Sequence, residues 1–354
     1  MVTRTTGPTL EERFTALLPP GADRETVAEV TYAALARHVP FDFACFALTD
    51  PATGVVTWAS KTRSLGIGDE EFAASEYGPP DINKLEDVVR RDPPVAALVL
   101  DTGGHPETCR RHRELMAPRF GFTDELRVAF LSRGACWAVL GAYRGPGDPP
   151  FSAADVVAVD GFREVVVGAV QRSLFGSRSA RSGEPAGHAG DPAGPAVLVV
   201  GADGRARHQT PAATAAVEQL GGLDHGSLPA AVLHVVVTTR TRGGPFETRT
   251  QGVDGRWVEL RAAPLGGGGP EGDVVVTVEA TPHATLSRLA LAAHGLTARE
   301  EDVALLVLQG LDTRGIAGAL FLSPHTVQDH LKTVFAKLGV SSRRELVARL
   351  VLEE

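Results

Sequence analysis

The chain of 354 residues has little cysteine and no long apolar run. Its three cysteines, Cys45, Cys109 and Cys136, lie in apolar or helical contexts, which indicates a reducing compartment and excludes a disulfide framework. No apolar run approaches the roughly 18–20 residues that cross a bilayer, and the longest, such as 195–200 and 231–237, have the length of a strand. Residues 1–8 lack the charged-then-apolar order of a secretory signal. We therefore expect a soluble, cytoplasmic protein with no membrane partner.

Sequence motifs of catalysis and of phosphotransfer are also missing. No phosphate-cradling glycine loop precedes a Lys-Ser/Thr pair, and no nucleophile elbow occurs. A phosphorelay receiver needs paired acids after its first strand, whereas the strand-like run 41–48 is followed by the lone Asp50. We expect no enzyme, no receiver and no cofactor. The net charge of −8 argues against wholesale coating of nucleic acid, but it allows a small basic surface on one domain.

Length and composition predict several domains. A chain of this length exceeds what one compact core organises. Residues 176–195 consist mainly of Gly, Ser, Ala, Pro, Arg and His and predict a flexible linker, while the glycine-rich stretch 266–272 predicts a hairpin loop. The expected organisation is an α+β domain over 1–175, the linker over 176–195, a second α+β module over 196–282 and an all-α domain over 283–354.

The first domain shows alternating helix and strand patterns. A helix is expected over 24–38, strands over 41–48 and 55–60 around the turn 50–54, and a strand pair at 125–131 and 135–144 around Ser132-Arg133-Gly134. Ser152 is a good N-cap for a helix from 153 to about 174. With its Phe41-Asp42-Phe43-Ala44-Cys45 segment and the Asp50-Pro51-Ala52-Thr53-Gly54 turn, the region resembles a GAF domain over roughly 24–174. The resemblance implies a small-molecule effector between the sheet and its covering helices, or an empty fold.

Six aromatic residues of this domain are candidates for a sensor pocket, and the alternative is that most of them fill the core. They are Phe41, Phe43, Phe46, Trp58, Trp137 and Tyr143.

His105, Cys109 and His112 are spaced i, i+4 and i+7, which would place them on one face of a helix as zinc or haem ligands. Three arginines surround them and no fourth ligand is evident. We therefore predict a solvated basic helix here and no metal.

The middle segment has the pattern of a second small sheet. Strands are expected over 196–200, 247–251, 256–263 and 273–281, with a helix over 211–220 and turns at Asp203-Gly204 and Asp254-Gly255. This order resembles a PAS-type sensor module, and the alternative is a connector specific to this class of protein.

The last sixty residues contain paired helix signals. Thr297 and Glu300 have capping-box spacing, Gly310 ends that helix, and Asp312 can cap the next. Ser323 and Pro324 predict the start of a third helix that ends at Gly339, and a last helix follows Ser341-Ser342. Two short helices with a tight turn between them are typical of a helix-turn-helix.

Residues 296–350 resemble the LuxR/GerE-type domain of bacterial regulators. The matching motifs include Leu296-Thr297-x-Arg299-Glu300, Ser323-x-x-Thr326-Val327, His330-Leu331-Lys332 and Lys337-Leu338-Gly339-Val340. The resemblance implies that the third helix enters the major groove of double-stranded DNA, with base contacts from Gln328, Asp329 and Lys332. Phosphate contacts are expected from the helix start at Ser323 and from His325, Thr326, His330 and Lys337.

The charge of this domain is modest, with five Lys or Arg against two acidic residues over 323–349. Family members often carry Lys where this chain has Gln328. We therefore expect a homodimer on a two-fold operator, formed through the last helix.

The resulting hypothesis is a sequence-specific DNA-binding transcription regulator that responds to a small-molecule effector, with RNA polymerase as a further candidate partner. One alternative is a ligand- or protein-binding scaffold whose C-terminal bundle docks a protein. A second is a constitutive regulator with empty sensor folds.

Overall fold

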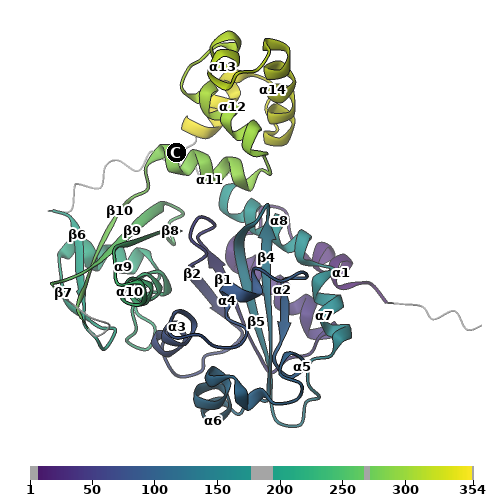
Figure 1. Cartoon of the computed structure of the whole chain (residues 1–354), viewed down its shortest axis with the longest axis vertical. Coiled ribbons are helices and arrows are strands. Elements are labelled where there is room, and N and C mark those ends of the chain that lie inside the picture. Colours follow the sequence, from purple (N-terminus) through teal and green to yellow (C-terminus); the bar gives the residue numbers. More distant parts are fainter. Residues whose placement is uncertain (1–6, 177–193, 267–271, 353–354) are drawn as a thin grey trace, which may run out of the picture. The chain divides into compact units, whose positions relative to one another are not determined.

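The computed structural model describes residues 7–176, 194–266 and 272–352. Most of the predicted linker and most of the glycine-rich loop lie outside the described residues. The chain forms two compact units, of which one holds both β-sheets and the other holds helices α11 to α15 (Figure 1).

The first sheet is built from five antiparallel strands in the order β2-β1-β5-β4-β3. The strands are β1 (Phe43–Thr49), β2 (Val56–Lys61), β3 (Val95–Ala97), β4 (Asp124–Ser132) and β5 (Ala135–Arg144). Arg133 and Gly134 both have positive φ, which suits the tight turn that joins β4 to β5. The two predicted strand pairs are confirmed.

One face of this sheet is covered by four helices, α1 (Leu10–Leu17), α2 (Arg24–His38), α7 (Ala153–Asp160) and α8 (Arg163–Phe175). Figure 1 shows α1, α2 and α7 on the side of the sheet away from α3 (Glu70–Tyr77). The predicted helix 24–38 is confirmed, but the predicted single helix from 153 is interrupted at Gly161. The interruption inserts the fully buried Phe162 between Phe14 and Phe130, with ring centroids 6.3 and 6.0 Å apart.

The opposite face carries α3 and several short helical turns. These are α4 (Leu85–Val88), α5 (Leu98–Asp101), the 3-10 turn η1 (Pro106–Thr108), the π-helical turn η2 (His112–Met116) and α6 (Ala117–Phe120).

The predicted basic helix through His105, Cys109 and His112 is wrong. His105 is exposed and precedes η1, Cys109 is buried at its end, and His112 opens the separate turn η2. Arg111 is buried in this region because its guanidinium pairs with Glu125. Over the described ranges, no group of three His, Cys, Asp or Glu residues is placed to hold a metal ion.

The second sheet repeats the connectivity of the first, in the order β7-β6-β10-β9-β8. Its elements are β6 (Ala196–Val200), β7 (Ala206–Gln209), α9 (Pro211–Gln219), α10 (Ala230–Arg242), β8 (Phe246–Gln251), β9 (Trp257–Pro264) and β10 (Val274–Ala280). The four predicted strands and the helix are confirmed, whereas β7, all of whose residues are exposed, gave no apolar signal.

The apolar run 231–237, which had the length of a strand, lies in helix α10. Leu233, Val235 and Val236 are all buried because α10 packs on its own sheet and also on β2 and α3. A helix that is covered on several sides has no polar face, and periodicity cannot then separate it from a buried strand.

Hydrogen bonds also join the two sheets into one unit. Arg24 Nη1 donates to the Gln251 carbonyl at 2.7 Å, and the buried Asp50 carboxylate accepts the backbone N–H of Arg249 at 3.0 Å.

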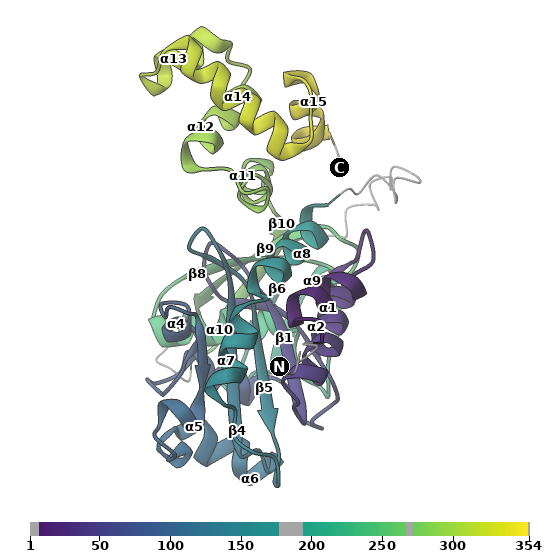
Figure 2. The ribbon, with the colours of Figure 1, turned by 90° about the vertical axis from the view of Figure 1, so that its right-hand side faces the viewer.

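The second unit contains α11 (His283–Ala293), α12 (Ala298–Leu308), α13 (Thr313–Leu320), α14 (Pro324–Leu338), α15 (Arg343–Val347) and a final π-helical turn (Ala348–Leu352). Figure 2 shows α14 between α13 and α15. The predicted caps at Thr297, Asp312 and Ser323 all form, and Gly339 ends α14 with a φ of 64°. None of the described helices is long and apolar enough to span a bilayer.

Leu35→Ala is expected to lower the free energy of unfolding by about 2–5 kcal/mol, because Leu35 is fully buried between α2 and the first sheet. Leu223→Ala, at a side chain that is 59% exposed in the same unit, should change it by less than about 0.5 kcal/mol. Urea denaturation followed by circular dichroism measures both, and equal losses would contradict the assignment of the core.

Candidate functional site

Helix α14 presents one apolar and one polar face. Val327, Leu331, Val334 and Leu338 are buried against α12 and α13 and fix the orientation of the helix. The opposite face exposes the predicted base-contacting residues Gln328, Asp329 and Lys332, together with His325.

The charged side chains on this face contact one another only loosely. The Asp329 carboxylate lies 3.7 Å from His325 Nε2 and 3.4 Å from Lys332 Nζ. Lys332 is 77% exposed, and exposed ion pairs of this kind contribute little to stability. Its ammonium is therefore able to turn toward another acceptor at small cost.

Two of the predicted phosphate-contacting residues build the start of the helix. Ser323 Oγ accepts the backbone N–H of Thr326 at 3.1 Å, and the two hydroxyl groups are 2.8 Å apart. Pro324 has no N–H, and those of Thr326 and Val327 are bonded to Ser323, so the His325 N–H is the donor of the first turn that is left for an anion. The other predicted contact from this group, His330, is half-buried.

Lys337, a predicted phosphate contact, makes an ion pair within the domain. Its Nζ donates to Glu300 Oε2 at 2.6 Å, and Glu300 itself is buried. Burial raises the pKa of Glu300, but Lys337 and the Thr297 N–H outweigh it and hold the pKa below its usual value. The ammonium of Lys337 thus joins α14 to the capping box of α12.

No contact within the domain was predicted for Arg343. Its guanidinium donates to the Leu311 carbonyl at 2.7 Å and to Thr313 Oγ1 at 3.0 Å, and so joins α15 to the turn between α12 and α13.

The first unit contains a cavity of about 120 Å³ between the first sheet, α3 and α10. Aromatic and aliphatic side chains form most of its wall, and the charged or polar lining residues are Lys61, Asp69, Glu76, Arg111, Arg127, Tyr143 and His234.

The six aromatic residues that are candidates for a sensor pocket are separated in the structure. Phe43 and Tyr143 line the cavity. Phe46 and Trp137 are buried in the core, Phe41 packs on Tyr32, and Trp58 lies under the Arg24 guanidinium. Successive side chains of a strand point to opposite faces, so along β1 Phe43 faces the cavity and Phe46 faces the helices.

Glu125 forms the centre of a buried ion network beside this cavity. Its carboxylate is 2.5 Å from Arg111 Nη2 and 2.9 Å from Arg127 Nε, and it accepts the hydroxyl of Tyr143 at 2.8 Å. Burial raises the pKa of Glu125, but the two guanidinium groups outweigh it and lower the pKa to about 2. Arg127 also pairs with Glu76 at 2.6 Å. Glu125 and Arg127, two residues apart on one face of a mainly apolar strand, are the sequence signal that could have indicated this network.

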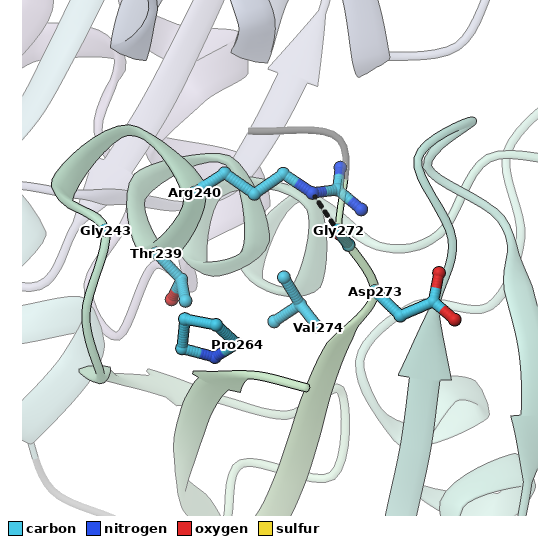
Figure 3. Close-up of a pocket in the computed structure, with 7 residues that line it drawn as sticks. All are labelled: Thr239, Arg240, Gly243, Pro264, Gly272, Asp273 and Val274. Atoms are coloured by element: carbon cyan, nitrogen blue, oxygen red, sulfur yellow. Dashed lines mark hydrogen bonds between the residues drawn. The ribbon is translucent and has the colours of Figure 1, made fainter. Parts of the chain in front are cut away.

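A second hollow lies in the other sheet, between Thr239, Pro264 and Val274 (Figure 3). Arg240 Nε donates to the Gly272 carbonyl across its edge at 3.2 Å. Its volume of about 10 Å³ suits at most a single water molecule, so it is not a candidate effector site.

Comparison with known proteins matches residues 294–350 to the family described as bacterial regulatory proteins, luxR family. The spore germination protein GerE of Bacillus subtilis is 41% identical over 56 residues, which cover 16% of this chain and 76% of GerE. The chain belongs to the LuxR family.

Other relatives match over the same short region. A protein of Mycobacterium tuberculosis named as an HTH-type transcriptional regulator is 56% identical over 52 residues, or 15% of this LuxR-family chain and only 6% of the mycobacterial protein. Likeness to solved structures is weak: a Vibrio cholera VqmA–ligand–DNA complex is 18% identical, with a TM-score of 0.23 over 44% of this chain and 81% of that one. The residues matched to the family include α12 to α14, whereas both sheets lie outside them.

Glu125→Gln in the LuxR-family chain is expected to lower the free energy of unfolding by about 3–5 kcal/mol at pH 7, because Arg111 and Arg127 lose their shared buried anion. A folded-state pKa of about 2 lies below the unfolded value of about 4.3. The stabilisation of the folded chain by ionised Glu125 is therefore complete above roughly pH 4.3, and it is lost as the pH falls through about 2.

Denaturant titrations at pH 7 and across this acidic window measure the effect. Glu86→Gln, in an exposed 4.0 Å pair with Arg90, is the matched control and should be nearly neutral. The free energy of unfolding of the unchanged chain should approach that of Glu125→Gln as the pH falls. A gap between the two that stays constant down to about pH 2 would contradict the role of the ion network.

Proposed function

We propose that this protein is a sequence-specific, DNA-binding transcription regulator that recognises DNA through α14. The observation that carries the proposal is the exposed row of Gln328, Asp329 and Lys332 on a helix whose other face is fixed by four buried apolar residues. A helix of this kind fits the major groove, where Gln recognises adenine and Lys recognises guanine or a phosphate. Membership of the LuxR family supports the same function.

DNA binding by this domain is proposed to require a homodimer. The modest positive charge of α14 and α15 gives one domain few phosphate contacts, and Lys337 is already paired with Glu300. Two copies on a two-fold operator double the contacts, and the surface of α15 is the expected dimer interface.

Signal response is proposed to reside in the unit that holds both sheets. A five-stranded sheet with helices on both faces and a cavity of about 120 Å³ supports the GAF-like assignment of the first module. The second module has the same strand order, which supports a PAS-like sensor fold. On this proposal the protein works in the cytoplasm without enzymatic chemistry, binds a small-molecule effector and meets RNA polymerase at its promoters.

The direct test is binding of the full-length protein to its own upstream DNA at about 50 and 200 mM salt. Specific binding that weakens steeply with salt supports the proposal, because phosphate contacts release counterions. If the C-terminal bundle instead docks a protein, the full-length protein will bind neither the upstream DNA nor a pool of random-sequence DNA.

Lys332→Ala is expected to weaken operator binding by about 1–3 kcal/mol and to lower the slope of log affinity against log salt by about 1. Fluorescence anisotropy with a labelled operator measures both. Arg90→Ala removes an equal charge from an exposed site in the other unit and serves as control. Unchanged affinity in Lys332→Ala would remove this residue from the interface.

Gln328→Ala is expected to reduce discrimination at one base pair of the operator by about 1–3 kcal/mol, because a bidentate amide contact to a base edge is lost. Affinity for random-sequence DNA should stay the same. Selection from a random-site pool with both proteins measures the change, and an identical consensus would refute base contact by this residue.

A further inference from the structure

The cavity in the first unit is lined by residues from both sheet modules. Most of its wall comes from β1, β2, β5 and α3, but His234 belongs to α10 of the second module. His234 is 7% exposed, and its ring packs at 5.2 Å from the ring of Tyr77, which lines the same cavity. A molecule in this cavity would therefore touch both modules.

The hydrogen bond of His234 defines what its ring offers to the cavity. Nδ1 lies 2.7 Å from the carbonyl oxygen of Val56, and a carbonyl only accepts, so Nδ1 must carry the proton. Burial lowers the pKa of His234, which favours the neutral ring. Nε2 is then an acceptor, and it has no hydrogen-bond partner in the parts of the chain that are described.

The other polar wall of the cavity offers donors. Arg127 uses Nε and Nη1 for Glu125, Glu76 and the Asn83 carbonyl, which leaves its Nη2 without a hydrogen-bond partner among the described residues. The neighbouring Arg111 is 3% exposed, and its Nη1 lies 3.8 Å from the Asp81 carboxylate. Buried guanidinium groups are ordinarily fully hydrogen-bonded, so Nη2 of Arg127 is the donor on this wall that is short of an acceptor.

The charges around the cavity are already balanced. Arg127 and Arg111 face Glu125 and Glu76, and Lys61 pairs with Asp69 at 2.6 Å. A bound anion would add a buried charge with no unpaired cation to balance it, which is costly. A neutral oxygen acceptor fills the missing hydrogen bonds without this cost.

We propose that the cavity binds a neutral, mainly apolar molecule with no more than one aromatic ring, which accepts a hydrogen bond from Arg127 and donates one to Nε2 of His234. The volume of about 120 Å³ is below the roughly 150 Å³ of a cavity that holds benzene, so a single ring fills the cavity and its polar substituents lie against Arg127 and His234. Phe43, Phe72 and Tyr77 supply the apolar wall. The molecule bridges the sheet of the first module and α10 of the second. That it acts as the effector rests on the proposed function.

The probe is 4-hydroxyacetophenone, which carries a hydroxyl donor and a carbonyl acceptor at opposite ends of one ring. Acetophenone lacks the donor, 4-ethylphenol lacks the carbonyl, and 4-hydroxybenzoate is an anion. Isothermal titration of the full chain should give the tightest binding with 4-hydroxyacetophenone and roughly tenfold or greater losses with each of the other three, because each loses one matched interaction or adds a charge.

His234→Phe tests the contribution of the second module. This variant should bind 4-hydroxyacetophenone no better than acetophenone, while His234→Gln, which keeps a donor for Val56 and an acceptor for the ligand, should retain the preference. His208→Phe changes an exposed histidine of the same module and should behave like the unchanged chain. If His234→Phe fails to fold, binding of the four probes to the unchanged chain and to His234→Gln still tests the proposal.

Three results would overturn the proposal. They are binding of 4-hydroxybenzoate as tight as that of the ketone, equal binding of acetophenone and 4-hydroxyacetophenone by the unchanged chain, and no binding of any probe up to about 1 mM. Operator binding is measured on the same samples. Its retention alongside failed probe binding refutes only the ligand assignment, whereas probe binding without operator binding refutes only the DNA-binding function.

Discussion

The first sheet module depends on one carboxylate. Glu125 lies on β4 with 2% exposure and neutralises two arginines that come from different parts of the chain. Without it, the apolar sheet would enclose unpaired guanidinium groups, at a cost of several kcal/mol. Because Arg127 also binds Glu76 of α3 and the Asn83 carbonyl, this carboxylate indirectly positions the helix and the loop that bound the cavity. Arg111, Arg127 and Glu76 of this ion network also form part of the polar wall of the candidate sensor cavity.

The helix-turn-helix was predictable because its signals are local. Thr297, Asp312 and Ser323 each cap the helix that follows within three residues, and the buried positions of α14 recur at helical spacing. Such patterns need no knowledge of the rest of the chain. The prediction missed Arg343 and the Glu300–Lys337 pair because these contacts join residues more than 30 positions apart.

The unit that holds both sheets was less predictable for the opposite reason. Its strands followed the apolar pattern, but α10 is buried by two modules at once and carried no helical periodicity. The segment from His105 to His112 was misjudged because the position of Arg111 is set by Glu125, which no local pattern reveals. The sequence alone could not assign the six aromatic residues to the pocket or to the core, because strand register decides on which face of the sheet each side chain lies.

The hydrogen bonds between the two sheets also bear on how the chain is synthesised. Arg24 to Gln251, Asp50 to Arg249 and Val56 to His234 span 227, 199 and 178 residues. During translation, β2 and α3 leave the ribosome long before α10. The Val56 carbonyl, and Ala73 of α3, which is buried in the same core cluster as Leu233 and Val236 of α10, are therefore exposed to water until α10 is made. Contacts of such long range are slow to close, so this side of β2 and α3 stays uncovered until α10 and its sheet have been synthesised, at about residue 280. The surface that completes the cavity is therefore the last side of the first module to be covered during synthesis.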